Sequence, residues 1–300
     1  MLAFGAACAP SPHREDDSGA PVIEPTTADI PGEDSALANA RTITPTSARE
    51  TFPWPTVIPL ADTLRRDVHG ARIRRGRAIL SATSDSLPAY VGNQLRCTSC
   101  HLEDGRRPDA LPWVGVIARF PQYRSRNALV NRIEDRVNDC FERSLSGRAL
   151  PHDSDPMRDI VAYLQFLSRG VPQGLRIARQ GAPAVQVTLA DTTRGAAVYR
   201  RSCVRCHGAA GEGTTLAPPL WGDGSYSNGA GMGRPRTAAA FIRANMPYDA
   251  PTLTEQEALD VATYINAQPR RVYSRGQLDW PFGGAPIDVP YVTAGGAPGR

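Results

Sequence analysis

The chain has 300 residues, of which 41% are hydrophobic and 21% are charged, a composition typical of a soluble protein with one or two domains. Its formal net charge is only +4, and every basic side chain is arginine because the sequence contains no lysine. So small a positive excess argues against a protein dedicated to binding nucleic acid. No apolar run is long enough to cross a membrane as a helix.

The first fifty residues combine a leader-like start with a stretch rich in Pro, Ala, Thr, Asp and Glu. The start is similar to the end of a bacterial lipoprotein signal, whose cysteine is lipidated after cleavage, although it lacks the basic part and most of the apolar part of an export signal. We therefore expect residues 1–50 to form a leader remnant and a disordered tether, with Cys8 as a candidate lipid anchor. The alternative is a disordered terminus with an incidental cysteine.

Two blocks of similar plan follow the tether. Each has an Arg-rich helical segment, then a C-x-x-C-H motif, then a final helix with apolar residues at helical spacing. The final helix of the first block is predicted to begin near Pro156. In the second block, a capping box from Thr254 to Glu257 marks the helix start. No convincing strand pattern appears, so the sequence predicts a mainly α-helical protein with two similar domains.

The predicted boundaries follow from breaks in composition. A Pro/Gly-rich tail ends the chain, and its Trp280, Phe282 and Tyr291 are expected to pack on a domain surface. The expected parts after the tether are domain 1 (51–172), a linker (173–190), domain 2 (191–272) and the tail (273–300).

The motif C-x-x-C-H occurs as Cys97–His101 and as Cys203–His207, and it is the attachment signature of c-type haem. One helical turn presents two thiols to the two vinyl groups of one haem, and the adjacent histidine reaches the iron. The sequence thus predicts two tandem class I cytochrome c domains with two covalently bound haem c groups. The residues predicted to hold them are Cys97, Cys100, His101, Cys203, Cys206 and His207.

Other uses of the motif fit less well. A four-thiolate zinc site would leave both histidines unexplained, and a redox C-x-x-C motif would need a βαβ context. Covalent haem attachment of this kind occurs outside the cytoplasm. We therefore expect the protein in the periplasm or on the outer face of the cell envelope.

The second iron ligand of each haem is predicted from position. Met246 lies in a loop before the final helix of domain 2, where small cytochromes place a methionine ligand. Met232 is the alternative candidate for this ligand. Either methionine could instead serve only in packing. Met246 is 39 residues after His207, and Cys140 is 39 residues after His101. Cys140 therefore occupies the same slot in domain 1 and is predicted to ligate haem 1.

Three alternatives to this role of Cys140 remain open: ligation by His152, ligation by Met157, or a buried and inert cysteine. A thiolate needs positive neighbours, which Arg132, Arg136 and Arg143 would provide. A thiolate ligand favours a low haem potential, and His/Met ligation favours a higher one. Electrons are then expected to run from haem 1 to haem 2.

Several stretches resemble the dihaem thiosulfate dehydrogenases. The specific likeness is CTSCHLEDGRRPDALPWVGVIARFPQYRSR followed by NRIEDRVNDCFERSLSGRALP, in the first block. PPLWGDGSYSNGAGM, FIRANMP and DWPFGGAPIDVPY extend the resemblance to the second block and the tail, so that it covers roughly residues 52–291. Some family members have a lysine beside the methionine ligand; Asn245 stands there in this chain.

The resemblance implies an enzyme that couples two thiosulfates into tetrathionate, or runs the reverse reaction. It also implies that His101 and Cys140 ligate the active-site haem, and that His207 and Met246 ligate the haem through which electrons leave. The implied partners are thiosulfate or tetrathionate and an external electron acceptor or donor, such as a cytochrome c or a membrane oxidase.

Arginine forks suit a small sulfur dianion, because they donate paired, charge-assisted hydrogen bonds. On a helix, Arg136 and Ser144 lie one turn to either side of Cys140, and Arg132 extends the same face by another turn. We expect these three residues to contact the substrate, and Arg143 to point elsewhere. The alternative is that some of the arginines bind haem propionates or solvate the helix.

Two other functions compete with this reading. A dihaem electron carrier without its own substrate would usually protect both irons with methionine or histidine, so the Arg-flanked Cys140 argues against it. An enzyme acting on another sulfur compound, such as sulfite or a sulfur-carrier protein, would show a wide groove at haem 1.

Overall fold

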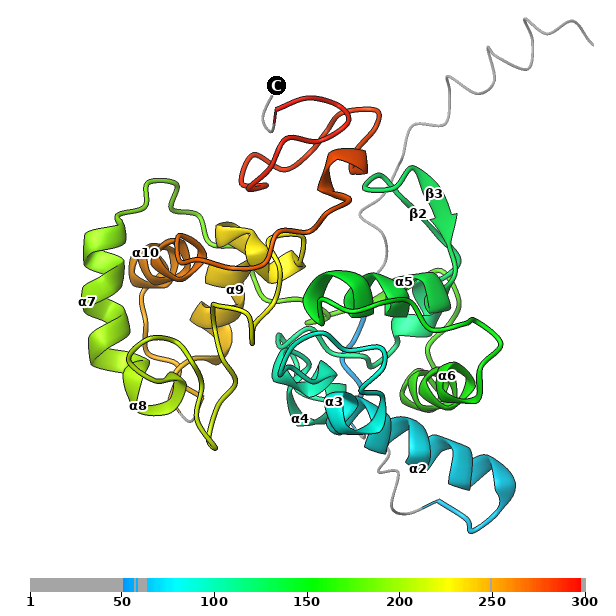
Figure 1. The fold of residues 1–300 in the computed structure, drawn as a ribbon. Coiled ribbons are helices and arrows are strands. Elements are labelled where there is room, and N and C mark those ends of the chain that lie inside the picture. Colours follow the sequence, from blue (N-terminus) through cyan, green and yellow to red (C-terminus); the bar gives the residue numbers. More distant parts are fainter. Residues whose placement is uncertain (1–50, 57, 59–63, 249, 298–300) are drawn as a thin grey trace, which may run out of the picture. The chain divides into compact units, whose positions relative to one another are not determined.

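The structure is a computed structural model that describes residues 51–56, 58, 64–248 and 250–297. Helices dominate (Figure 1). The predicted tether and Cys8 lie outside the described residues. The α-helices are α2 (Val68–Ser81), α3 (Thr83–Ser86), α4 (Leu102–Gly105), α5 (Ile133–Asp139), α6 (Asp155–Leu167), α7 (Thr192–Ser202), α8 (Val204–His207), α9 (Pro235–Asn245) and α10 (Glu255–Asn266).

The first block is built on a crossing of α2 and α6 (Figure 1). The helices approach so closely at Gly76 that a Cβ on this residue would lie only 2.0 Å from the Asp159 carbonyl oxygen. The neighbouring Arg75 donates from Nε and Nη2 to the Asp159 carboxylate at 2.8 and 3.1 Å. Around this crossing lies an apolar core that includes the fully buried Ile73 and Met157.

The second block repeats the same crossing between α7 and α10. A Cβ on Gly195 would lie 2.1 Å from the Asp260 carbonyl oxygen. Arg194 donates from Nε and Nη2 to the Asp260 carboxylate at 2.7 and 3.1 Å. An Arg-Gly pair on the first helix and an aspartate on the last therefore recur in both blocks, which confirms that they share one plan.

The predicted helix starts are also confirmed. Pro156 stands in the first turn of α6. The capping box at α10 has both of its hydrogen bonds: the Glu257 N–H donates to Thr254 Oγ1 at 3.2 Å, and the Thr254 N–H donates to Glu257 Oε2 at 2.9 Å. Among the described residues, no helix is both long and apolar enough to span a membrane.

Short strands are present that the sequence pattern did not predict. β2 (Gln122–Arg124) and β3 (Leu129–Asn131) form an antiparallel hairpin, and β1 (Thr51–Phe52) pairs in parallel with β4 (Arg176–Ile177). These strands have only two or three residues each, too few for an alternating pattern to stand out. The hairpin matters because it directs arginines toward the site described below.

The C-terminal tail packs on the rest of the molecule, beside the hairpin (Figure 1). Trp280 is buried, and its backbone N–H donates to the Arg126 carbonyl oxygen at 2.7 Å. Tyr291 packs against Gly276 and is half-buried. The expectation for Phe282 is wrong: its side chain is 86% exposed, because the chain turns through positive-φ glycines at 283 and 284 directly after it.

Candidate functional site

The first C-x-x-C-H motif lies on a short 3-10 turn, η2 (Cys97–Ser99), that leads into α4. His101 Nδ1 is hydrogen-bonded to the Leu111 carbonyl oxygen. A carbonyl oxygen only accepts, so Nδ1 carries the proton and Nε2 keeps a free lone pair. Burial lowers the pKa of His101 to about 4, so the ring is neutral at pH 7. A neutral, oriented imidazole is the form that ligates a metal.

The second motif repeats this arrangement on α8. The His207 Nδ1–H donates to the Pro218 carbonyl oxygen at 2.8 Å, and burial lowers the pKa of His207. A cavity of about 860 Å³ opens beside the motif, within the range of cofactor sites. Its walls are largely apolar and include Leu220, Phe241, Ile242, Leu253 and Ile265.

Both motifs therefore fit a covalent haem. None of the five cysteines among the described residues forms a disulfide. Each histidine offers Nε2, and the cavity beside His207 also has Cys100 of the first motif in its wall. Among the described residues, no cluster of three or more His, Cys, Asp or Glu side chains is arranged to hold a bare metal ion.

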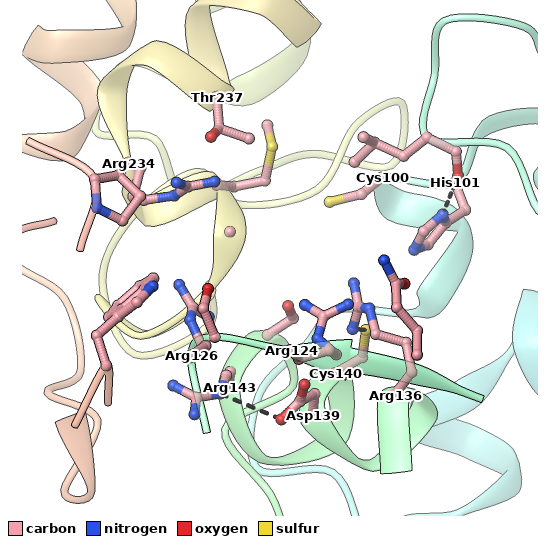
Figure 2. A pocket seen from close by; sticks show the side chains of 18 of the residues that line it. Cys100, His101, Arg124, Arg126, Arg136, Asp139, Cys140, Arg143, Arg234 and Thr237 are labelled. Carbon is pink, nitrogen blue, oxygen red and sulfur yellow. Dashed lines mark hydrogen bonds and ion pairs between the residues drawn. The ribbon is translucent and has the colours of Figure 1, made fainter. Parts of the chain in front are cut away.

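A second cavity, of about 490 Å³, lies beside His101 and is lined by Cys140 (Figure 2). The sequence predicts Cys140 as the partner of His101 and leaves His152 and Met157 as alternatives. The other two do not line this cavity: Met157 is fully buried in the core, and His152 Nε2 lies 3.2 Å from Asp135 Oδ1. Of the three candidates, Cys140 alone shares a cavity with His101.

Cys140 opens a π-helical segment, η4 (Cys140–Ser144), directly after α5. The Leu145 N–H donates to the Cys140 carbonyl oxygen at 2.9 Å, a bond five residues long. Such π-turns are rare and occur often at functional sites. From the preceding turn, Arg136 Nη1 donates to Cys140 Sγ at 2.9 Å. This contact places a guanidinium directly on the sulfur.

The helical face predicted around Cys140 is present only in part. Ser144 lines the cavity with Arg136. Arg132 does not, because it is the residue before the first turn of α5, where its extended backbone directs the side chain into solvent toward Glu134 at 2.8 Å. Arg143 is buried and pairs with Asp279 at 2.7 Å through both terminal nitrogens.

Three arginines of this cavity were not identified from the sequence as site residues. Arg124 comes from β2, Arg126 from the turn after it, and Arg234 from the residue before α9 (Figure 2). Burial and the nearby Arg136 lower the pKa of Arg124 to about 10, so it stays charged at pH 7 among like charges. A cavity lined by so many guanidinium groups favours a bound anion.

The two methionine candidates of the second block lie in different places. Met246 follows α9 and lines the cavity of His207, whereas Met232, in the 3-10 turn η5 (Gly231–Gly233), lines both cavities. Asn245 is buried and donates from Nδ2 to the Asp109 carbonyl oxygen at 3.0 Å, so it ties the loop of Met246 to the first block.

Comparison with protein families matches both blocks. Residues 89–173 match the model described as SoxA/TsdA, cytochrome c domain, and residues 190–265 match that of cytochrome c oxidase, cbb3-type, subunit III. Thiosulfate dehydrogenase of Psychrobacter arcticus is 42% identical over 244 residues, which are 78% of this chain and 75% of the relative. That of Allochromatium vinosum is 44% identical over 234 residues, 73% of this chain and 87% of the relative.

A solved structure is similar as well. Thiosulfate dehydrogenase (TsdBA) from Marichromatium purpuratum, in its as-isolated form, superposes with a TM-score of 0.67 at 37% identity. The match covers 77% of this chain and 50% of the longer chain in the solved structure.

Proposed function

The chain belongs to the thiosulfate dehydrogenase family, and we propose that it couples two thiosulfate ions into tetrathionate, or runs the reverse reaction, in the cavity beside Cys140. It is an enzyme of this type, with two tandem cytochrome c domains and two covalently bound haem c groups. Domains of this kind are typically extracytoplasmic. The coupling converts two S₂O₃²⁻ into S₄O₆²⁻ and releases two electrons, for which the two haems supply one-electron acceptors.

The residues that would hold these groups follow from the site. Cys97 and Cys100 would attach haem 1, and His101 and Cys140 would ligate its iron. The shared cavity of His101 and Cys140 supports this pairing. For the second group the residues are Cys203, Cys206, His207 and Met246, whose side chains line one cavity.

This ligand set gives the two haems different potentials. A thiolate lowers the potential of the haem beside Cys140, and a thioether raises that of the haem beside Met246. With the lower potential at haem 1 and the higher potential at haem 2, electrons would pass from haem 1 to haem 2 and then to an external acceptor, such as a cytochrome c or a membrane oxidase.

The observation that carries the proposal is the contact of Arg136 with Cys140 Sγ at 2.9 Å inside an arginine-lined cavity. Arg136 brings a positive charge and an N–H donor to this sulfur. Arg124 and Arg126 supply further positive charge for the sulfonate oxygens of a dianion, and Ser144 supplies a hydroxyl donor. Charge and donors converge beside one sulfur atom, which suits chemistry at sulfur.

The proposal is tested by turnover of purified holoprotein with thiosulfate and ferricyanide, followed by quantification of tetrathionate. We expect one tetrathionate for two thiosulfates consumed and two ferricyanides reduced. If oxidised protein forms no tetrathionate from thiosulfate, and reduced protein forms no thiosulfate from tetrathionate, with both haems intact, the proposal is refuted.

A further inference from the structure

The C-terminal segment lines the arginine cavity with Trp280 and Pro286. Next to Trp280 stands Asp279, which is 2% exposed. Its carboxylate accepts hydrogen bonds of 2.7 Å from Arg143 Nη1 and Nη2 and from the Tyr291 hydroxyl. Arg126 Nε lies 3.7 Å from the same carboxylate, at Oδ2. Asp279 therefore joins the hairpin turn, η4 and the tail at one point.

Arg126 is held by the residues around this point. Its guanidinium lies over the Trp280 ring, 4.5 Å from the ring centre, and its Nη1 donates to the Gly229 carbonyl oxygen at 3.2 Å. The Trp280 backbone N–H also donates to the Arg126 carbonyl oxygen. Backbone and side chain of Arg126 are thus both fixed by contacts outside its own hairpin, and its guanidinium faces the cavity (Figure 2).

Arg143 belongs to the same cluster. Asp279 takes both of its terminal nitrogens, and the guanidinium lies over the Tyr273 ring, 4.3 Å from the ring centre. Its Nε lies 3.5 Å from Asp139 Oδ1. A guanidinium engaged in this way is a poor ligand for an incoming anion. It serves instead to tie η4, which carries Cys140 and Ser144, to the tail.

We infer that Asp279 is a positioning residue for substrate binding: it aligns Arg126 on the cavity wall and anchors η4 through Arg143. The inference rests on the proposed function of the cavity. It makes the C-terminal segment part of the site, although that segment follows Cys140 by more than a hundred residues.

The charge of Asp279 allows this role to be separated from simple electrostatics. A carboxylate next to the cavity repels a bound dianion, so removing its charge would by itself tighten anion binding. Loss of positioning has the opposite effect, because Arg126 and η4 would no longer be held in the binding geometry. Asp279→Asn keeps the size of the side chain and removes the charge, and the two explanations then predict opposite signs.

The experiment measures thiosulfate binding by calorimetry to the fully reduced holoprotein, which has no capacity to oxidise it, and KM and kcat in the oxidised state. We expect Asp279→Asn to weaken binding and raise KM about tenfold, or about 1.4 kcal/mol, with a smaller change in kcat. Asp288→Asn is the control. It removes a carboxylate of the same segment that accepts a hydrogen bond from the Arg236 backbone N–H at 2.9 Å, and the variant should bind thiosulfate like wild type. Tighter or unchanged binding by Asp279→Asn would overturn the inference.

Tyr291→Phe is a second variant, in case Asp279→Asn does not fold. Burial and the nearby Asp279 raise the pKa of Tyr291 to about 12, so the substitution changes no charge at pH 7. We expect binding weakened about two- to threefold by the loss of one hydrogen bond to Asp279. Wild-type affinity in this variant would also count against the inference. Failure of wild-type protein to oxidise thiosulfate would instead refute the proposed function.

Discussion

Arg136 Nη1 lies 2.9 Å from Cys140 Sγ, one helical turn earlier in the chain. The contact places a permanent positive charge next to Cys140, the residue that the spacing from the haem histidines predicts as an iron ligand. Because Arg136 also lines the cavity, it contacts both the sulfur and any anion bound beside it. The first two predictions follow from this contact.

Cys140→Met should leave both haems attached and abolish turnover, because the four attaching cysteines are untouched while the reactive sulfur is replaced by a thioether. We expect kcat to fall at least about 100-fold. Haem staining after denaturing electrophoresis and the ferricyanide assay measure the two properties separately. A fully active variant would remove Cys140 from the mechanism.

Arg136→Gln should raise KM for thiosulfate about 10- to 100-fold, because one charge-assisted hydrogen bond and a full positive charge are lost from the cavity. Arg132→Gln is the control, at the residue directly before the same helix, with a side chain in solvent beside Glu134, and should stay within about twofold of wild type. Equal effects of the two substitutions would show that only the net charge of the helix matters.

Met246→Leu should lower the reduction potential of one haem, because a thioether ligand raises that potential and leucine offers no lone pair. Met232→Leu should leave both potentials nearly unchanged, since we assign Met232 to packing between the two cavities. Potentiometric titration of the two variants decides the assignment. The reverse result, with the larger shift in Met232→Leu, would exchange the roles of the two methionines.

Gly195→Ala should destabilise the second domain by about 1–3 kcal/mol, because its Cβ would collide with the Asp260 carbonyl oxygen and force α7 and α10 apart. Gly76→Ala should do the same at the α2–α6 crossing. The control is Gly181→Ala, where a Cβ would have no neighbour within 4 Å. Denaturant unfolding measures the difference, and equal stability of the Gly195 and Gly181 variants would contradict the shared crossing.

The elements that local sequence determines were predicted well. The helices α6 and α10 begin where Pro156 and the Thr254–Glu257 capping box indicate, because caps act within one turn. The haem motifs were identified for the same reason, since their ligands are adjacent in sequence. Cys140 was identified because it occupies the position in the first domain that Met246 occupies in the second. The second domain thus served as a related sequence for the comparison.

The rest of the cavity could not be predicted, because its walls come from distant segments. Arg126 and Arg234 reach it from a short hairpin and from the second block, and Trp280 from the tail. Arg132 was expected on the helical face because periodicity does not show that α5 begins only at Ile133. The change from α- to π-helical winding at Cys140 likewise leaves no mark in the spacing of apolar residues.

The most direct test is to mix oxidised holoprotein with thiosulfate under anaerobic conditions and follow the haem α-band, with Cys140→Met protein in parallel. We predict reduction of the wild-type haems with formation of tetrathionate, and an unchanged spectrum in the variant. Reduction of both proteins to the same extent would show that electrons enter without Cys140. No reduction of the wild type by thiosulfate, together with no reoxidation of its reduced form by tetrathionate, would contradict the assignment of this cavity.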